Sequence, residues 1–177
     1  MKFTIREITM TAMGIALYVA LSLCLQVPVF ENYYLCLGYI VMLVYCYSFG
    51  SVKAALVGGI GCLLYCVLTN GLRGLPGWML GNVFIGLALG VVFHYTKKLK
   101  YIKPFVVKIV EIVSIVIVTA IGILLIKSMV EMVLYAQPLF IRIIKNMYAF
   151  IADVVVLVIS LPLCVTLDKY LYRHRSN

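Results

Sequence analysis

Long apolar runs, separated by short polar or turn-forming breaks, occupy most of this chain. The breaks fall at Pro28, at Gly50, at residues 71–77, at the lysine-rich residues 97–103 and at Pro138. Because a membrane-spanning helix needs about 20 apolar residues, each run is a candidate transmembrane helix. The pattern therefore predicts six helices, near residues 5–27, 36–50, 52–70, 77–96, 104–135 and 139–171.

These runs leave little of the chain for loops. The run at 36–50 is short for a full span, whereas those at 104–135 and 139–171 are long enough to tilt or to protrude. Apolar residues make up 65% of the 177 residues and charged residues only 12%, which is more hydrocarbon than a soluble core of this size can bury. The sequence predicts an all-α integral membrane protein, a single domain over residues 1–177 that forms a bundle of six transmembrane helices.

Positive charges gather at one set of helix ends. If the N-terminus lies inside, the cytoplasmic side holds Lys2, Arg6, Lys53, Lys97, Lys98, Lys100, Lys103, Lys108, Lys169, Arg173 and Arg175. The outer side then holds Arg73, Lys127, Arg142 and Lys145. Because cytoplasmic loops carry the excess of lysine and arginine, both termini are expected in the cytoplasm.

The sequence argues against several classes of function. No GxxxxGK[ST] phosphate-binding loop occurs, so any ATP must be hydrolysed by another chain. The basic residues lie at the ends of apolar runs rather than in a stripe with interleaved aromatics, which argues against nucleic-acid binding. The six cysteines form no CxxC pair, so neither a metal site nor a cofactor is expected. Paired carboxylates with metal-ligand spacing and a Ser-His-Asp set are also missing, which argues against an enzyme.

Three segments with polar or aromatic residues face outward in this topology: 28–36, 72–82 and 136–146. In the second, Pro76 and nearby glycines bend the chain beside Trp78. Indole, amide and guanidinium groups together suit a planar heterocycle or a carboxylate, whereas a plain loop with an interfacial tryptophan anchor explains the same residues. The candidate ligand-binding residues in or next to the first two segments are Glu31, Asn32, Tyr33, Asn70, Arg73, Trp78 and Asn82.

Polar side chains also interrupt the last two predicted helices. Asp153 lies roughly 20 Å below the outer end of the run at 139–171, at 1.5 Å per residue, and a carboxylate at that depth needs a partner. We predict that Asp153 and Asn146 contribute to the ligand site, and a structural hydrogen bond between helices is the alternative for Asp153. Lys127 and Glu131, spaced i, i+4, suit a local ion pair as well as they suit ligand contact.

Small residues follow one face of the first predicted helix. Ala12, Ala16 and Ala20 recur at i, i+4 and i+8, so another helix can lie close against this face. That helix belongs either to a partner protein or to the same bundle. The glycines of the runs at 52–70 and 77–96 are expected to serve packing within the bundle.

A resemblance to a known family adds to this interpretation. The six-helix layout and the runs ITMTAMGIALYVAL, GSVKAALVGGIG and GLPGWMLGNVFIGLALG resemble the substrate-binding S components of energy-coupling factor (ECF) vitamin transporters. The run KNMYAFIADVVV in the last helix is similar to the family pattern only in outline. The chain departs from the family near the start of the second helix, where Gly38-Tyr39 stands in place of a frequent Gly-Asp pair.

The resemblance implies a protein of the bacterial plasma membrane that captures a water-soluble vitamin or precursor outside the cell. Its partners are then the lipid bilayer, a transmembrane T subunit and two ATPase subunits. In the family the alanine face of helix 1 docks on the T subunit, and Ala12, Ala16 and Ala20 match it. Ligand contacts in the family come from the loops after helices 1 and 3 and from helices 4 to 6.

The identity of the vitamin stays open at this point. An arginine and several aromatic residues place pyridoxine or the thiamine pyrimidine precursor slightly ahead, with riboflavin and pantothenate as competitors. The main alternative from another class is a non-transport membrane scaffold of the MreD cell-shape type. Such a scaffold also has five or six helices and no catalytic signature, but it has no need of a deep carboxylate beside a polar outer cap.

Overall fold

The chain forms a bundle of helices in the computed structural model, which describes residues 4–24, 27–30, 33–69, 75–98 and 103–175. The helices are α1 (Ile5–Cys24), α2 (Gly38–Ser48), α3 (Ser51–Leu68), α4 (Leu75–Thr96), α5 (Pro104–Thr119), η1 (Ala120–Lys127), α6 (Ser128–Tyr135) and α7 (Leu139–Arg175). Among the described residues, 5 helical segments are long and apolar enough to cross a membrane, and α2 is shorter. The predicted all-α membrane fold and its short second helix are therefore confirmed.

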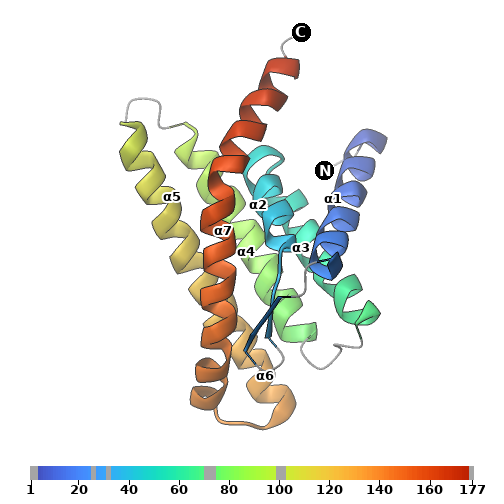
Figure 1. Ribbon diagram of the computed structural model, residues 1–177, viewed down its shortest axis with the longest axis vertical. Coiled ribbons are helices and arrows are strands. Elements are labelled where there is room, and N and C mark those ends of the chain that lie inside the picture. Colours follow the sequence, from blue (N-terminus) through green and yellow to red (C-terminus); the bar gives the residue numbers. More distant parts are fainter. Residues whose placement is uncertain (1–3, 25–26, 31–32, 70–74, 99–102, 176–177) are drawn as a thin grey trace.

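The two ends of the bundle differ in what they hold. The start of α1, the turn between α2 and α3 and the end of α7 lie at one end, which Figure 1 shows at the top. The opposite end holds a short β-hairpin and the turn between α6 and α7, and we call it the hairpin end. The charge pattern assigns the same two groups of segments to opposite sides of the membrane.

The hairpin was not predicted. Strands β1 (Val27–Phe30) and β2 (Tyr33–Leu35) pair antiparallel, with an irregularity between Pro28 and Phe30. The prediction of a first helix reaching residue 27 was wrong, because α1 ends at Cys24. Pro28 has no backbone N–H and restricts the residue before it to extended conformations, and the valine and aromatic residues around it favour a strand. The hairpin packs along α7.

Two other boundaries bear on the site. Helix α4 begins at Leu75, slightly before the prediction, and Pro76 lies in its first turn, where a missing N–H removes no helical hydrogen bond. Trp78 is therefore part of the helix. The predicted helix at 104–135 is continuous, but its middle, Ala120–Lys127, is a π-helix. Such insertions are rare and change the direction in which the following side chains point.

Glycines allow the central helices to approach closely, as predicted for packing. A Cβ at Gly86 on α4 would lie 2.7 Å from the backbone nitrogen of Ala55 on α3. A Cβ at Gly81 would lie 2.7 Å from the carbonyl oxygen of Gly122 in η1. Helix α4 is thus held against α3 on one side and η1 on the other, and it carries Trp78 and Asn82 into the middle of the bundle.

Candidate binding site

Charged and polar side chains lie inside the bundle between the end of η1, α6 and the first half of α7, toward the hairpin end. We call this set the polar cluster, and it consists of Lys127, Ser128, Glu131, Arg142, Asn146 and Asp153. All members except Arg142 are buried. Charged side chains inside a membrane protein are costly and usually serve a function. These residues therefore form a candidate functional site.

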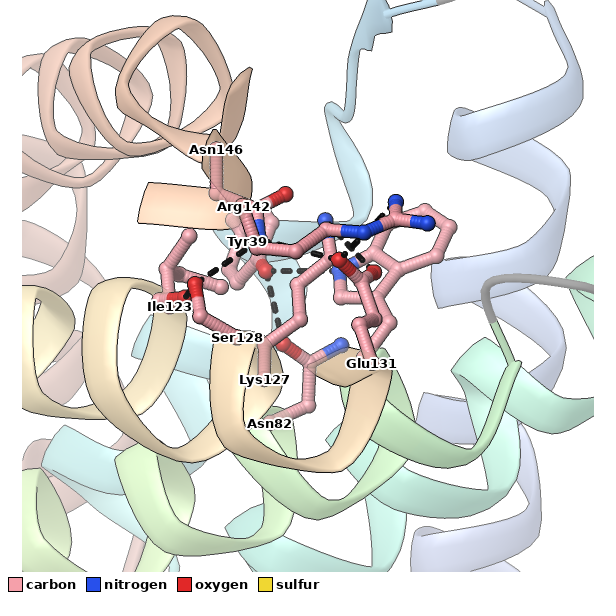
Figure 2. Close-up of polar contacts among 9 residues, drawn as sticks. Tyr39, Asn82, Ile123, Lys127, Ser128, Glu131, Arg142 and Asn146 are labelled. Atoms are coloured by element: carbon pink, nitrogen blue, oxygen red, sulfur yellow. Dashed lines mark hydrogen bonds and ion pairs between the residues drawn. The ribbon is translucent and has the colours of Figure 1, made fainter. Parts of the chain in front are cut away.

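Glu131 is the centre of the polar cluster (Figure 2). Its Oε1 atom lies 3.9 Å from the Lys127 Nζ atom, and its Oε2 atom lies 3.7 Å from the Arg142 Nη1 atom. Asn146 donates a hydrogen bond of 3.0 Å to the same Oε2 atom. The local ion pair between Lys127 and Glu131 is therefore present, but Glu131 also serves two side chains of α7.

Two atoms of the polar cluster have hydrogen-bonding capacity left. The Asn146 amide nitrogen donates to Ser128 Oγ at 3.0 Å as well as to Glu131, which uses both of its protons. The buried Asn146 Oδ1 atom and the buried Arg142 Nε atom have no hydrogen-bond partner among the described residues. One is an acceptor and the other a donor, so a ligand with an N–H or O–H group and a carbonyl oxygen complements them.

The formal charges of the polar cluster balance. Lys127 and Arg142 are cationic, and Glu131 and Asp153 are anionic when ionised. Asp153 is only 4% exposed and lies in α7 near Tyr39 and Lys127. A site of this composition suits a polar ligand without net charge better than it suits an anion.

The first turn of α4 places an aromatic ring beside the polar cluster. A Cβ at Gly77 would lie 2.9 Å from the carbonyl oxygen of Lys127, so α4 packs directly on the end of η1. The Lys127 Nζ atom lies 6.0 Å from the centroid of the Trp78 ring. Tyr65 packs edge-on against Trp78, with 5.7 Å between the ring centroids. These contacts hold the indole in a fixed orientation.

A chain of hydrogen bonds leads from Trp78 into the bundle. The indole Nε1 atom donates to the Tyr39 hydroxyl at 3.0 Å, and that hydroxyl donates to Asn82 Oδ1 at 2.6 Å. The Asn82 amide nitrogen donates to the Tyr18 hydroxyl at 3.1 Å. Tyr39, Asn82 and Tyr18 are all fully buried. We call these four residues the hydrogen-bond chain.

The structure brings four of the predicted ligand-binding residues to this region. Trp78 and Asn82 belong to the hydrogen-bond chain, and Asn146 and Asp153 belong to the polar cluster. Tyr33 lies in β2, which packs along α7. The remaining predicted residues lie outside the described part of the chain, and they are Glu31, Asn32, Asn70 and Arg73.

Arg142 of the polar cluster, and the two tyrosines that lie behind the candidate site in the hydrogen-bond chain, were not predicted. Tyr39 and Tyr18 lie in apolar runs, where a tyrosine is ordinarily a packing residue. Their role depends on which polar atom of another helix lies within hydrogen-bond distance of the hydroxyl group. Arg142 was counted as an outer-side charge, yet its side chain is only 16% exposed and reaches Glu131. A signal for Arg142 was available, because it precedes Asn146 by one helical turn on the same face of α7.

The alanine face of α1 points away from the bundle. Ala12, Ala16 and Ala20 are all exposed, and so are the neighbouring Met13 and Leu17. The opposite face of the helix is the one that packs on α2 and α3. Packing within the same chain therefore does not account for the alanines in the structure.

Comparison with known families agrees with these features. Residues 2–169 match the family described as the ECF-type riboflavin transporter, S component. The chain belongs to this family. No curated protein matches the sequence. The resemblance to ECF S components is thus confirmed over nearly the whole chain, and membership of a family of transporter components favours transport over the scaffold alternative.

Membership also sets the general role of this S component. It is a multi-pass membrane protein of a vitamin-uptake system, and its family is one of transporter components rather than enzymes. An S component of this kind works with a T subunit and ATPases, which accounts for the missing phosphate-binding loop in the sequence.

Proposed function

We propose that this S component binds riboflavin at the hairpin end, outside the cell, and delivers it through a T subunit and two ATPases. The observation that carries the proposal is the polar cluster, with its unpartnered Asn146 Oδ1 and Arg142 Nε atoms beside the Trp78 ring. The positive-inside pattern of the sequence supports this orientation, because it assigns the hairpin end to the outer side.

The chemistry of riboflavin matches this site. Its flavin ring is planar and aromatic, and one edge offers carbonyl oxygens and an imide N–H, while the ribityl chain offers hydroxyl groups. The imide or a hydroxyl donates to Asn146 Oδ1, a carbonyl accepts from Arg142 Nε, and the ring packs against Trp78. Riboflavin has no net charge, so its binding does not depend on an excess of positive or negative charge in the polar cluster.

Pantothenate fits this site less well than riboflavin, whereas pyridoxine and the thiamine pyrimidine precursor fit it equally well. Pantothenate carries a carboxylate, for which a charge-balanced cluster offers no excess of positive charge. Pyridoxine and the thiamine pyrimidine precursor are small heterocycles that the same donors and acceptors suit, and they ranked ahead in the sequence analysis. The family description names riboflavin, and this shifts the preference to the flavin.

The test of this function is direct binding to the purified chain. Riboflavin fluorescence should be quenched when the detergent-solubilised protein is added, and mass spectrometry should find a stoichiometric flavin released by heat from protein expressed in rich medium. Pyridoxine and the thiamine precursor are added as competitors. The proposal is supported if neither competitor displaces riboflavin. Stoichiometric release of another vitamin would instead make that vitamin the substrate.

Asn146→Leu should weaken riboflavin binding strongly. Leucine has nearly the same shape as asparagine but removes the buried acceptor that is left for the ligand. The expected loss is about 1 to 3 kcal/mol, or roughly 5- to 150-fold in Kd, measured by fluorescence titration. Ser128→Ala is the control, because it removes one hydrogen-bond partner of Asn146 and leaves the free acceptor in place. Equal losses in both variants would mean that Asn146 only holds the helices together.

Trp78→Ala is expected to weaken riboflavin binding by a similar factor. The substitution removes the aromatic surface beside Lys127 and also the indole donor to Tyr39. Trp78→Phe separates these two contributions, because phenylalanine keeps a ring and loses only the donor. Titration should show that most affinity is retained in Trp78→Phe. Unchanged affinity in Trp78→Ala would reduce the residue to the interfacial anchor considered from the sequence.

A further inference from the structure

The hydrogen-bond chain has a fixed direction. An indole N–H can only donate, so the Tyr39 oxygen must accept from Trp78, and the Tyr39 proton is then directed at Asn82 Oδ1. This sets the orientation of the Asn82 amide, whose nitrogen faces the Tyr18 hydroxyl. Each bond therefore depends on the one before it, starting from the residue that lies beside the polar cluster.

Tyr18 is held so that it cannot respond by rotating its ring. A Cβ at Gly61 on α3 would lie 2.6 Å from one edge of the Tyr18 ring, and a Cβ at Gly38 would lie 2.9 Å from the other. The ring thus lies between two glycine backbones that leave it no free space. Because the ring is closely packed on both edges, a displacement of its hydroxyl is transmitted to the α1 backbone.

Tyr39 is the link at which a ligand acts on the chain. Its hydroxyl accepts from the Trp78 indole and gives its single proton to Asn82 Oδ1. A ligand that accepts the Trp78 N–H removes the donor that fixes the direction of this hydroxyl. If the Tyr39 proton leaves Asn82, the amide is no longer oriented toward Tyr18.

We propose that Tyr18 is a positioning residue that couples ligand occupancy at the hairpin end to the placement of α1. This inference rests on the proposed function, because the opposite face of α1 carries the exposed Ala12, Ala16 and Ala20. Ligand binding then changes the affinity of this face for the T subunit, and by thermodynamic reciprocity docking changes the affinity for the ligand by the same factor.

The experiment measures that factor. The full chain in nanodiscs is titrated with a purified T subunit–ATPase module, with and without saturating riboflavin, and the ratio of the two Kd values is the coupling factor. We expect a factor of at least about 5 for the unmodified chain. Tyr18→Phe should bring the factor to within about twofold of 1, while the riboflavin Kd of the solitary chain stays within about threefold.

Tyr45→Phe is the matched control. Its hydroxyl also donates to the α1 backbone, at the carbonyl of Met10, but Tyr45 is not part of the hydrogen-bond chain. The control should keep the coupling factor of the unmodified chain. An unchanged factor in Tyr18→Phe, or a factor of 1 in the unmodified chain that still binds riboflavin, would overturn the inference alone. An unmodified chain that binds no riboflavin overturns the proposed function and the inference together.

A second measurement covers the case in which Tyr18→Phe does not fold. Fluorotyrosine is placed at position 18 or at position 45 in the otherwise unchanged chain, and its fluorine NMR signal is followed as riboflavin is added. The signal from position 18 should shift by more than the signal from position 45, because only Tyr18 belongs to the hydrogen-bond chain, whereas Tyr45 senses α1 only through its bond to Met10. A signal from position 18 that stays constant while riboflavin binds would contradict the coupling.

Discussion

Ala16→Leu is expected to abolish ATP-driven vitamin uptake while the solitary chain still binds riboflavin. Ala16 is the middle of three exposed alanines on α1, so its side chain lies on a surface and not in the bundle. Small residues let two helices approach until their backbones are nearly in contact, and a leucine there holds them several ångströms apart. Because the substitution does not touch the hydrogen-bond chain or the polar cluster, ligand binding should be unaffected.

The measurement compares uptake of labelled riboflavin with equilibrium binding in the same variant. Val113→Leu on α5 is the control, since Val113 is also an exposed apolar residue and α5 does not pack on α1. The control should transport normally. Loss of both uptake and binding in Ala16→Leu would show that the alanine face supports the bundle itself, and normal uptake would exclude it as the docking surface.

Most of the fold follows from hydrophobicity alone. In a bilayer every backbone polar group must be paired within its own segment, so a long apolar run has few alternatives to a helix. The pattern therefore predicts each spanning segment and the short α2. It does not predict the hairpin at 27–35, because strands need a pairing partner that lies outside any one run. It also does not predict the π-helix Ala120–Lys127, because a change of hydrogen-bond pattern leaves the apolar composition of 104–135 unchanged.

The site was only partly predictable for a related reason. Asp153 and Asn146 stand out because charges and amides are costly in an apolar run, and both are in fact buried on α7. Tyr18 and Tyr39 do not stand out, because a tyrosine is acceptable in a core with or without a partner for its hydroxyl. Only the approach of α1, α2 and α4 around Asn82 gives these residues their place in the hydrogen-bond chain.

Helix α4 connects the polar cluster to the hydrogen-bond chain. Its glycines bring it against α3 and η1, its first turn carries Trp78 to the polar cluster, and Asn82 lies one turn further along the same helix. The two proposed binding residues on α4 are therefore positioned by a helix rather than by a loop. A ligand at the hairpin end acts on a preformed set of donors and acceptors, which reduces the ordering that binding requires.

Glu131→Gln should cause the largest loss of stability among single substitutions in the site. Glu131 is 5% exposed and faces both Lys127 and Arg142, so its removal leaves two cations inside the bundle with less compensation. Removing one partner of a buried ion pair lowers the free energy of unfolding by about 3 to 5 kcal/mol, because the remaining charge stays desolvated. Glutamine keeps the shape of the side chain, so the effect should come from the charge. A thermal unfolding scan in detergent should show a clearly lower midpoint.

The bridge between Glu7 and Lys53 provides the comparison for this prediction. Its atoms are closer, at 2.7 Å, but the Glu7 side chain is 35% exposed. An exposed pair contributes at most about 1 kcal/mol, so Glu7→Gln should shift the midpoint much less. Adding Lys127→Met to Glu131→Gln should recover part of the loss, because it removes one of the two buried cations that Glu131 compensated. Equal shifts for Glu7→Gln and Glu131→Gln, or no recovery in the double variant, would show that charge compensation does not stabilise the polar cluster.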